Sequence, residues 1–528
     1  MDLPSPGPLP LPLPPPRHLR WWPLGVIAAV AIGGLIKIQV VDRETPFQAR
    51  NLVTGALALG VFVAALLWWM LLSRARWRHR WMGLGALVLV VGLASATVRI
   101  RGVSGDLVPI FDPRWTQAPA PVSPPAPVPI PRTPPMVRPS PSQDDGFPQF
   151  MGPRRNGVVT GPALATQWST TAPEVVWRQP IGPAWSGFVI AGDLALTQEQ
   201  LGPEERVTCY ELATGKLRWA HADEDRYINT IAGEGPRATP TLAGGRVYTL
   251  GARGRLNCLD LASGHLHWTR SLTQEAACGV PEWGFSGSPL IHEGQVIVSA
   301  GGGTGHSLLA FRTDTGEPAW AGGSSGVGYA SPLAATLAGR PQILIVNHRS
   351  LASHDPRSGA VLWEVPFGAG MPLVANPVVI APDSVLVSAG YNVGSERFSV
   401  SAGTQEPVSL WKSRKLKAKF ANPILRGGYV YGLDDGILAC IDIRDGSQRW
   451  KEGRYGHGQG LLHGDLLILM SESGELILLN PTPEAPNELG RLPVFSSKTW
   501  NPIALRGNQL LVRNDREAAL VTLPLAGP

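Results

Sequence analysis

Residues 258–268 read CLDLASGHLHW, and in this stretch Asp260, Gly264 and Trp268 follow one another at a spacing of four residues. The same spacing of acid, glycine and tryptophan occurs at Glu211/Gly215/Trp219, Asp355/Gly359/Trp363 and Asp442/Gly446/Trp450. A fifth copy, Gly316/Trp320, has Arg312 in the place of the acid. Repetition at one fixed spacing predicts an internally repeated fold.

The repeat has the period of a β-propeller blade. With Trp177 and Trp411, which end similar apolar strands, the tryptophans recur every 39 to 52 residues. This period is typical of blades with four short strands each. Short β-prone runs bounded by Gly, Asp or Asn agree with it. They lie at 246–250, 295–299, 343–346, 384–388, 429–431 and 466–469.

Each copy contains turn residues followed by a packing residue. Asp and Ser side chains bond the local backbone, and Gly accepts a positive φ between the third and fourth strands of a blade. The tryptophan is then predicted to dock between adjacent blades, which gives Trp219, Trp268, Trp320, Trp363 and Trp450 a structural role.

A second mark is a small residue or Asn followed by Pro. It recurs at Thr239-Pro240, Ser288-Pro289, Ser331-Pro332, Asn376-Pro377, Asn422-Pro423 and Asn501-Pro502. We expect it just before the second strand of each blade, because Pro is tolerated as the first residue of a strand.

These repeats resemble the tryptophan-docking repeats of the PQQ-like (quinoprotein alcohol dehydrogenase-like) propeller family, over about residues 147–525. That family includes quinone-dependent dehydrogenases and the BamB-type propellers of outer-membrane assembly. The resemblance implies an all-β, eight-bladed propeller. Seven blades would end near Trp219, Trp268, Trp320, Trp363, Trp411, Trp450 and residues 490–493. In the eighth, strand 175–180 would pair with C-terminal strands from 509–525, which leaves no free sheet edge.

The charge is distributed unevenly along the 528 residues. Residues 1–145 carry a net charge of +7, and the remainder carries −1. The nearly neutral propeller has no aromatic-plus-basic motif, so nucleic acid is not an expected partner.

Three apolar runs precede the repeats, at 22–41, 51–72 and 81–98, and each approaches the length of about 20 residues that a membrane-spanning helix needs. We predict a disordered Pro-rich tail at 1–20, a three-helix transmembrane anchor at 21–100, a Pro-rich linker at 101–146 and the propeller at 147–528. A signal peptide followed by two spans is one alternative, because Arg17 and Arg20 precede the first run. A proline-rich ligand for a recognition module is the alternative to the linker.

Arginines predict the orientation of these spans. Arg74, Arg76, Arg78 and Arg80 lie between the second and third runs, which marks that loop and the N-terminus as cytoplasmic. After a third crossing the propeller lies outside the cytoplasm. The expected location is therefore the inner (cytoplasmic) membrane, with a periplasmic propeller.

The resemblance raises the question of quinone chemistry. A dehydrogenase of this family needs Ca²⁺ on acidic and amide oxygens, and many members have two adjacent cysteines against the quinone. The four cysteines, Cys209, Cys258, Cys278 and Cys440, include no adjacent pair, and three of them occupy equivalent places in separate blades. We expect buried free thiols, no catalytic residue, no metal and no cofactor. PQQ with calcium belongs to the alternative interpretation.

Candidate binding residues lie shortly before the predicted inner strands. They are Arg237, Trp283, Lys419, His457, Lys498 and Trp500. Inner strands of all blades begin around one axis, so these residues are expected to converge at the mouth of the central channel, although they are equally compatible with an ordinary channel lining. Residues 150–157, FMGPRRNG, are predicted to form a structural lid, in which Arg154 and Arg155 leave room for an anion or partner.

Two functions remain open. The first is a membrane-anchored, non-catalytic scaffold that binds an envelope protein or a small anionic or aromatic ligand at the channel mouth. The alternative is a PQQ-dependent membrane-bound alcohol or sugar dehydrogenase.

Overall fold

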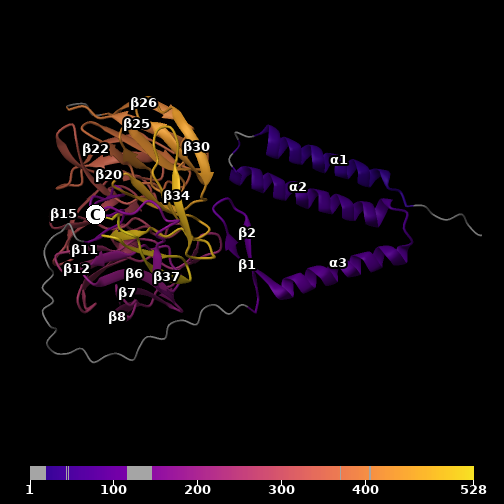
Figure 1. The fold of residues 1–528 in the computed structure, drawn as a ribbon, viewed down its shortest axis with the longest axis horizontal. Coiled ribbons are helices and arrows are strands. Elements are labelled where there is room, and N and C mark those ends of the chain that lie inside the picture. Colours follow the sequence, from indigo (N-terminus) through magenta and orange to yellow (C-terminus); the bar gives the residue numbers. More distant parts are fainter. Residues whose placement is uncertain are drawn as a thin grey trace, which may run out of the picture. The chain divides into compact units, whose positions relative to one another are not determined.

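The computed structural model describes residues 19–42, 45, 47–115, 146–368, 370–402 and 406–527. The chain divides into two compact units, Met1–Thr116 and Gln117–Pro528, and each is described by itself. The first is mainly helical and the second is built of sheets (Figure 1). The tail predicted at 1–20 and the linker predicted at 101–146 lie largely outside the described residues.

The first unit contains three apolar helices. They are α1 (Trp22–Ile36), continued by the π-helical turn η1 (Lys37–Val41), α2 (Phe47–Leu67), continued by η2 (Trp68–Leu72), and α3 (Trp77–Thr97). The three resulting segments, of 20, 26 and 21 residues, are long and apolar enough to cross a membrane. After α3, strands β1 (Val98–Val103) and β2 (Pro109–Pro113) form an antiparallel hairpin.

The second unit is built of eight antiparallel sheets, the blades. In seven of them the four strands follow one another in the chain, and the eighth combines strands from both ends of the propeller. Blade one consists of β5 (Val189–Ala191), β6 (Leu194–Leu201), β7 (Glu204–Glu211) and β8 (Leu217–Asp223), and blade two of β11 (Thr241–Ala243), β12 (Arg246–Leu250), β13 (Arg255–Asp260) and β14 (Leu266–Ser271). Blade three consists of β15 (Leu290–His292), β16 (Gln295–Gly302), β17 (His306–Arg312) and β18 (Pro318–Gly322), and blade four of β19 (Leu333–Leu337), β20 (Arg340–Val346), β21 (Ser350–His354) and β22 (Val361–Pro366). Between blades lie the short hairpin β9 (Ile228–Asn229) and β10 (Gly233–Glu234), and helix α4 (Leu272–Glu275).

Blades five to eight complete the propeller. Blade five consists of β23 (Val378–Ile380), β24 (Ser384–Ala389), β25 (Gly394–Ser399) and β26 (Val408–Ser413), and blade six of β27 (Ile424–Arg426), β28 (Tyr429–Asp434), β29 (Ile437–Asp442) and β30 (Gln448–Arg454). Blade seven consists of β31 (Gln459–His463), β32 (Leu466–Met470), β33 (Glu475–Leu479) and β34 (Glu488–Pro493), and β3 (Val158–Val159) pairs in parallel with β31. Blade eight consists of β35 (Ala504–Arg506), β36 (Gln509–Arg513) and β37 (Glu517–Thr522), together with β4 (Glu174–Pro180).

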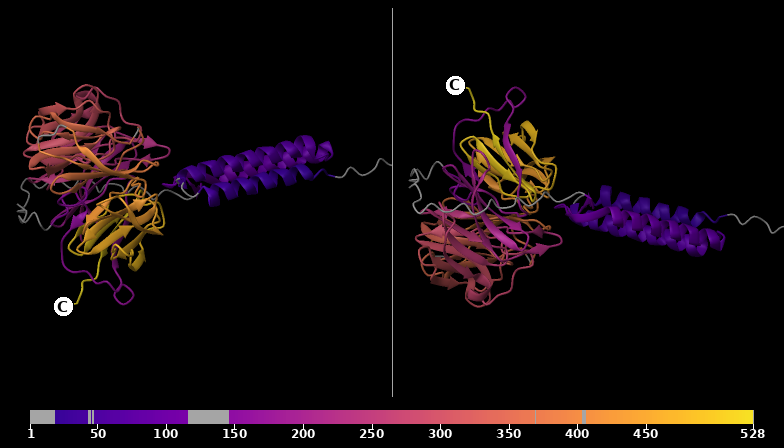
Figure 2. Two further views of the ribbon diagram at one scale, coloured as in Figure 1. Left: turned by 90° about the horizontal axis from the view of Figure 1, so that it is seen from above. Right: turned by 90° about the horizontal axis from the view of Figure 1, so that it is seen from below.

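The ring closes in the eighth blade, as the sequence predicted. Strand β4, from the start of the propeller, pairs antiparallel with β37 near the C-terminus, with Trp177 opposite Leu520. Figures 1 and 2 show the consequence: the yellow C-terminal strands lie beside the magenta strands of the first blade. Pairing the two ends of the domain in one sheet satisfies backbone groups that an open array would expose.

The repeat tryptophans join neighbouring blades. Each indole N–H donates a hydrogen bond to a backbone oxygen of the following blade: Trp219 to Leu261 (3.1 Å), Trp268 to Thr313 (3.1 Å), Trp320 to Pro356 (3.0 Å), Trp411 to Ile443 (2.8 Å) and Trp450 to Thr482 (2.7 Å). The repeat glycine explains the close stacking, since a Cβ on Gly359 would lie 2.3 Å from the Trp320 ring.

Trp363 is the exception among the predicted docking residues. Its indole donates to Gln342 Oε1 of its own blade, at 2.9 Å. In the following blade, Pro407 stands four residues before Trp411, where five other blades have the repeat glycine. Trp363 therefore lacks the glycine surface on which Trp219, Trp268, Trp320 and Trp411 stack.

The small-residue-Pro mark precedes the first, innermost strand in six of the blades, and its predicted place before the second strand is wrong. The mark links blades through side chains. Thr239 Oγ1 accepts from the N–H of Gly187, and the series continues blade by blade through Ser288, Ser331, Asn376 and Asn422, with distances of 2.7 to 3.1 Å. A short side chain with an oxygen is required because it must reach the neighbouring backbone.

The lead-in segment 147–159 crosses the inner strands. Phe147 bridges to Ile190 of the first blade, Leu242 N–H of the second donates to Pro148 O, and Leu462 N–H of the seventh donates to Gly157 O. Arg155 is 3% exposed and donates to Ser288 O and Pro289 O of the third blade, at 2.9 and 2.8 Å. Burial lowers the pKa of its guanidinium to about 9. Arg155 thus has a structural role in the ring, while Arg154 is exposed.

Candidate functional site

The six predicted site residues all lie in connections that lead into an inner strand. Arg237 precedes β11, Trp283 precedes β15, Lys419 precedes β27, His457 precedes β31, and Lys498 and Trp500 precede β35. We call this end of the ring, where the inner strands begin, the mouth. Neighbouring inner strands contact one another, for example β35 and β5, so residues from distant parts of the chain come together there.

Four of the six predicted residues, Lys419, His457, Lys498 and Trp500, lie together. With Trp185 and Phe420 they form one group, which we call the mouth cluster. The Trp500 ring lies 4.9 Å from the ring centroids of both Trp185 and Phe420, and His457 meets Phe420 edge-on at 5.4 Å. The rings of the first two pairs are tilted by 42° and 48°, and the edge-on contact of His457 with Phe420 is a favoured geometry of aromatic rings. The cluster joins the connections that precede the first, sixth, seventh and eighth inner strands.

Both lysines of the mouth cluster lie over aromatic faces. Lys498 Nζ is 4.0 Å from the ring centre of Trp500 and 4.9 Å from that of Trp185. Lys419 Nζ is 4.9 Å from Tyr391 and 5.0 Å from Phe420, and its residue is only 4% exposed. The rings hold the ammonium groups by cation–π attraction, so that positive charge and indole surface are presented together.

Glu472, which the sequence analysis missed, fixes the orientation of the cluster. Its Oε1 accepts from the indole N–H of Trp500 at 3.0 Å, and its Oε2 accepts from the backbone N–H of His457 at 3.0 Å. Glu472 lies in the turn between β32 and β33. These two hydrogen bonds to one carboxylate restrain the Trp500 ring and the backbone of His457.

Arg237 and Trp283 form a second group. The Arg237 guanidinium donates from Nε to Trp283 O at 2.8 Å and from Nη2 to Gly233 O at 2.9 Å, and it stacks 4.4 Å above the Tyr227 ring. Burial lowers its pKa to about 10. Only the backbone of Trp283 takes part in these contacts, so the predicted role of its indole stays a prediction.

One loop joins the two groups. The indole N–H of Trp185, in the mouth cluster, donates to Ala232 O, and the neighbouring Gly233 O accepts from Arg237. Glycine is required at 233: its φ is +85°, and a Cβ would lie 3.2 Å from Trp185 Nε1. The sequence prediction that the six residues converge at one end thus describes two groups connected through the 223–237 loop.

Several residues of the mouth were not predicted. Trp185 carried the same signal as the others, because it precedes the first inner strand at a similar offset. Tyr391 carried no such signal, since it lies in the connection between β24 and β25, which reaches the mouth only because alternate connections of a blade share one face.

Calcium-bound PQQ, which belongs to the alternative interpretation, would need a set of oxygen ligands for the ion. Ca²⁺ takes six to eight oxygen ligands in proteins. Within the described ranges, no group of three or more His, Cys, Asp or Glu side chains could hold a metal ion. Glu472, whose carboxylate contacts the mouth cluster, accepts from the indole N–H of Trp500 and the backbone N–H of His457. All four cysteines are free thiols in separate places, as expected, and three of them are buried.

A family model described as "Outer membrane protein assembly factor BamB" matches residues 203–452. The matched residues lie within the eight-bladed β-propeller and cover its second to fifth blades together with parts of the first and sixth. None of the curated proteins compared with the chain matches it in sequence.

Solved structures with this fold differ widely in kind. This chain is similar to quinohemoprotein alcohol dehydrogenase from Comamonas testosteroni, with a TM-score of 0.53 and 12% identity over 73% of this chain and 82% of that one. It is also similar to the computationally designed protein Ika8, with a TM-score of 0.50 and 11% identity over 66% of this chain and all of that one. BamB from Moraxella catarrhalis aligns with a TM-score of 0.48 and 15% identity, over 66% of this chain and all of that one. At such identities the likeness shows the fold alone.

Proposed function

We propose that this protein is a membrane-anchored, non-catalytic binding scaffold whose PQQ-like propeller captures an anionic aromatic group at the mouth cluster. The observation that carries the proposal is the position of Lys498 between two indoles, with Lys419 and Phe420 beside them. Ammonium groups bind carboxylates through charge-assisted hydrogen bonds, and the indoles offer stacking surface. A partner protein could supply this group from an acidic and aromatic segment.

The arrangement of the mouth favours binding over turnover. Glu472 orients the cluster by accepting from Trp500 and His457, and the described residues contain no group of three or more His, Cys, Asp or Glu side chains that could hold a metal ion. The proposed partner belongs to the cell envelope, and the proposed location of the propeller is the periplasmic side of the inner membrane.

Lys498→Met tests the site, because methionine keeps the length and apolar stem of lysine while removing the charge. The probe is naphthalene-2-carboxylate, titrated into the full chain in detergent while tryptophan fluorescence is recorded. We expect the variant to bind this probe about tenfold to a hundredfold more weakly, as a lost hydrogen bond to a charged group predicts. His457→Ala should also weaken binding, by loosening Phe420.

Lys412→Met is the matched control, since its side chain is 72% exposed on β26. It should bind the carboxylate like the parent, and the uncharged 2-methylnaphthalene should bind parent and Lys498→Met equally. Equal affinity of the parent for charged and uncharged probes would contradict the site. Oxidation of alcohols by the full chain after addition of PQQ and Ca²⁺ would contradict the non-catalytic part.

The proposed orientation has its own test. Reporter fusions after residue 73 should report the cytoplasm, and fusions after residues 42 and 142 should report the opposite side, because the arginine-rich loop stays inside. Residue 142 lies outside the described residues. An active cytoplasm-only reporter at 142 would reverse the proposed topology.

A further inference from the structure

The three-helix unit has one strongly basic end. The loop between α2 and α3, residues 73–80, reads SRARWRHR and contains four arginines and a histidine. The start of α1 lies at the same end, since Arg20 N–H donates to Ser73 O at 3.2 Å and the Trp68 indole donates to Arg20 O at 2.8 Å. No Asp or Glu occurs in residues 68–82.

The loop has a defined shape that leaves three arginines exposed. Arg80 stabilises it from within, by donating from Nε to Ala75 O at 3.0 Å and from Nη1 to Met70 O at 2.5 Å. Ser73 is fully buried and its hydroxyl donates to Trp69 O at 2.7 Å. Arg74, Arg76 and Arg78 are exposed. They precede or begin α3, whose N-terminal dipole also favours negative charge.

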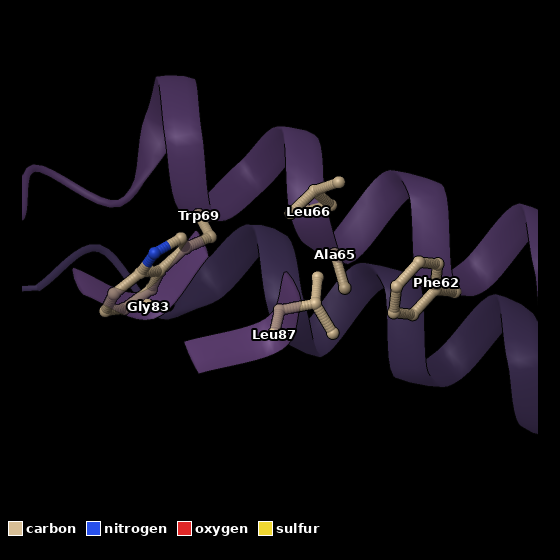
Figure 3. A pocket seen from close by; sticks show the side chains of 6 residues that line it. All are labelled: Phe62, Ala65, Leu66, Trp69, Gly83 and Leu87. Atoms are coloured by element: carbon tan, nitrogen blue, oxygen red, sulfur yellow. The ribbon is translucent and has the colours of Figure 1, made fainter. Parts of the chain in front are cut away.

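An apolar hollow lies directly beside this loop, between α2 and α3 (Figure 3). It is lined by Phe62, Ala65, Leu66, Trp69, Gly83 and Leu87, and its volume is about 250 Å³. The indole of Trp69 forms the end nearest to the loop: its N–H donates to Arg80 O at 3.3 Å, and a Cβ on Gly83 would lie 2.8 Å from it. In Figure 1 the two helices are nearest at this loop and diverge away from it.

We infer that this end of the helical unit binds one anionic phospholipid, with its headgroup on Arg74, Arg76 and Arg78 and an acyl chain in the hollow. The inference rests on the membrane insertion of the three helices. Within a bilayer the apolar hollow is filled by hydrocarbon, and the three arginines, whose own loop contains no acidic residue, select a negatively charged headgroup. Basic pockets between membrane helices recognise such headgroups. A zwitterionic phospholipid fills the hollow equally well but gains nothing from the arginines.

The test uses native mass spectrometry of the full chain in detergent, with dipalmitoyl phosphatidylglycerol and dipalmitoyl phosphatidylcholine as probes. The parent should retain the glycerol lipid in preference to the choline lipid. The triple exchange Arg74→Gln, Arg76→Gln and Arg78→Gln should weaken phosphatidylglycerol binding on the order of 100-fold, about fivefold for each cation, and leave phosphatidylcholine unchanged.

Ala65→Leu fills the hollow and leaves the arginines in place, so it should also weaken phosphatidylglycerol binding. Its matched control is Ala58→Leu, on the same helix and exposed. The control for charge is the exchange of three exposed propeller arginines, Arg218, Arg357 and Arg449, to Gln. Equal retention of both lipids by the parent would overturn the inference. So would unchanged phosphatidylglycerol binding by Ala65→Leu, because charge alone would then account for it.

Discussion

Replacement of Trp268 by alanine is expected to lower the free energy of unfolding of the propeller by about 3 to 5 kcal/mol, the usual cost of removing a large aromatic from a packed core. Trp268 is 9% exposed and packs between the second and third blades, with Tyr248 at 6.1 Å and Phe311 in the same core cluster. A Cβ on Gly316 would lie 2.6 Å from the Trp268 ring, which shows how closely the next blade approaches it. Chemical denaturation followed by circular dichroism measures the change.

Trp268→Phe separates packing from hydrogen bonding. Phenylalanine keeps an aromatic face against Gly316 but cannot donate to Thr313 O, so its stability should lie between those of the parent and Trp268→Ala. Trp115→Ala is the control for loss of an exposed tryptophan, since Trp115 is 71% exposed, and it should have little effect. A Trp268→Ala protein as stable as the parent would refute the docking role.

Glu205 is expected to make the propeller less stable as the pH rises from about 5 to about 8. This residue of β7 is 6% exposed, and its carboxyl accepts from Ala252 N–H at 3.1 Å. Burial raises its pKa from the ordinary 4.5 to about 7; the Ala252 bond opposes the shift, and Asp225 adds to it. Asp223 and Arg237 also face this carboxyl, with opposite effects.

The direction follows from proton binding. Between pH 4.5 and 7 the folded protein keeps a proton on Glu205 that the unfolded chain has lost, so the stabilising contribution is present at low pH and disappears as the pH rises through 7. The size of the effect is at most about 3 kcal/mol. Glu205→Gln should therefore flatten the dependence of unfolding free energy on pH.

Exposed Glu224, in the loop between β8 and β9, supplies the comparison. Glu224→Gln should retain the pH dependence of the parent. Denaturation curves at pH 5, 6, 7 and 8 measure all three proteins, and a Glu205→Gln variant with the slope of the parent would show that another group is responsible.

The architecture was predictable because the same short sequence pattern recurs along the chain at a regular period. Asp260, Gly264 and Trp268 identify a turn and a docking strand by spacing alone, and β12 has the predicted bounds, Arg246–Leu250. The first membrane-length segment, Trp22–Val41, also has its predicted bounds. Blade count and closure followed from the resemblance of these repeats to a known fold. The place of the small-residue-Pro mark was missed, because its role is a hydrogen bond to another blade and not a local preference.

The site was predictable only in part. The rule that residues before inner strands converge found Lys419, His457, Lys498 and Trp500, which meet around Phe420 and Trp185. It could not find Glu472, because this residue lies in the turn between β32 and β33 of the seventh blade and not before an inner strand. Its carboxylate accepts from the indole of Trp500, which precedes the eighth blade. Nor could it show that the Arg237 guanidinium donates hydrogen bonds to backbone oxygens and stacks on the Tyr227 ring.

The sequence by itself thus determined the elements whose causes lie within a few residues or within one repeat: the apolar helices, the blade strands and the turns. Only the tertiary structure decided which side chains meet at the mouth and which face the hollow beside the arginine loop. The physical reason is that strand and turn preferences act over neighbouring residues. Contacts such as Trp185 with Trp500 join positions more than three hundred residues apart and depend on how the whole ring closes.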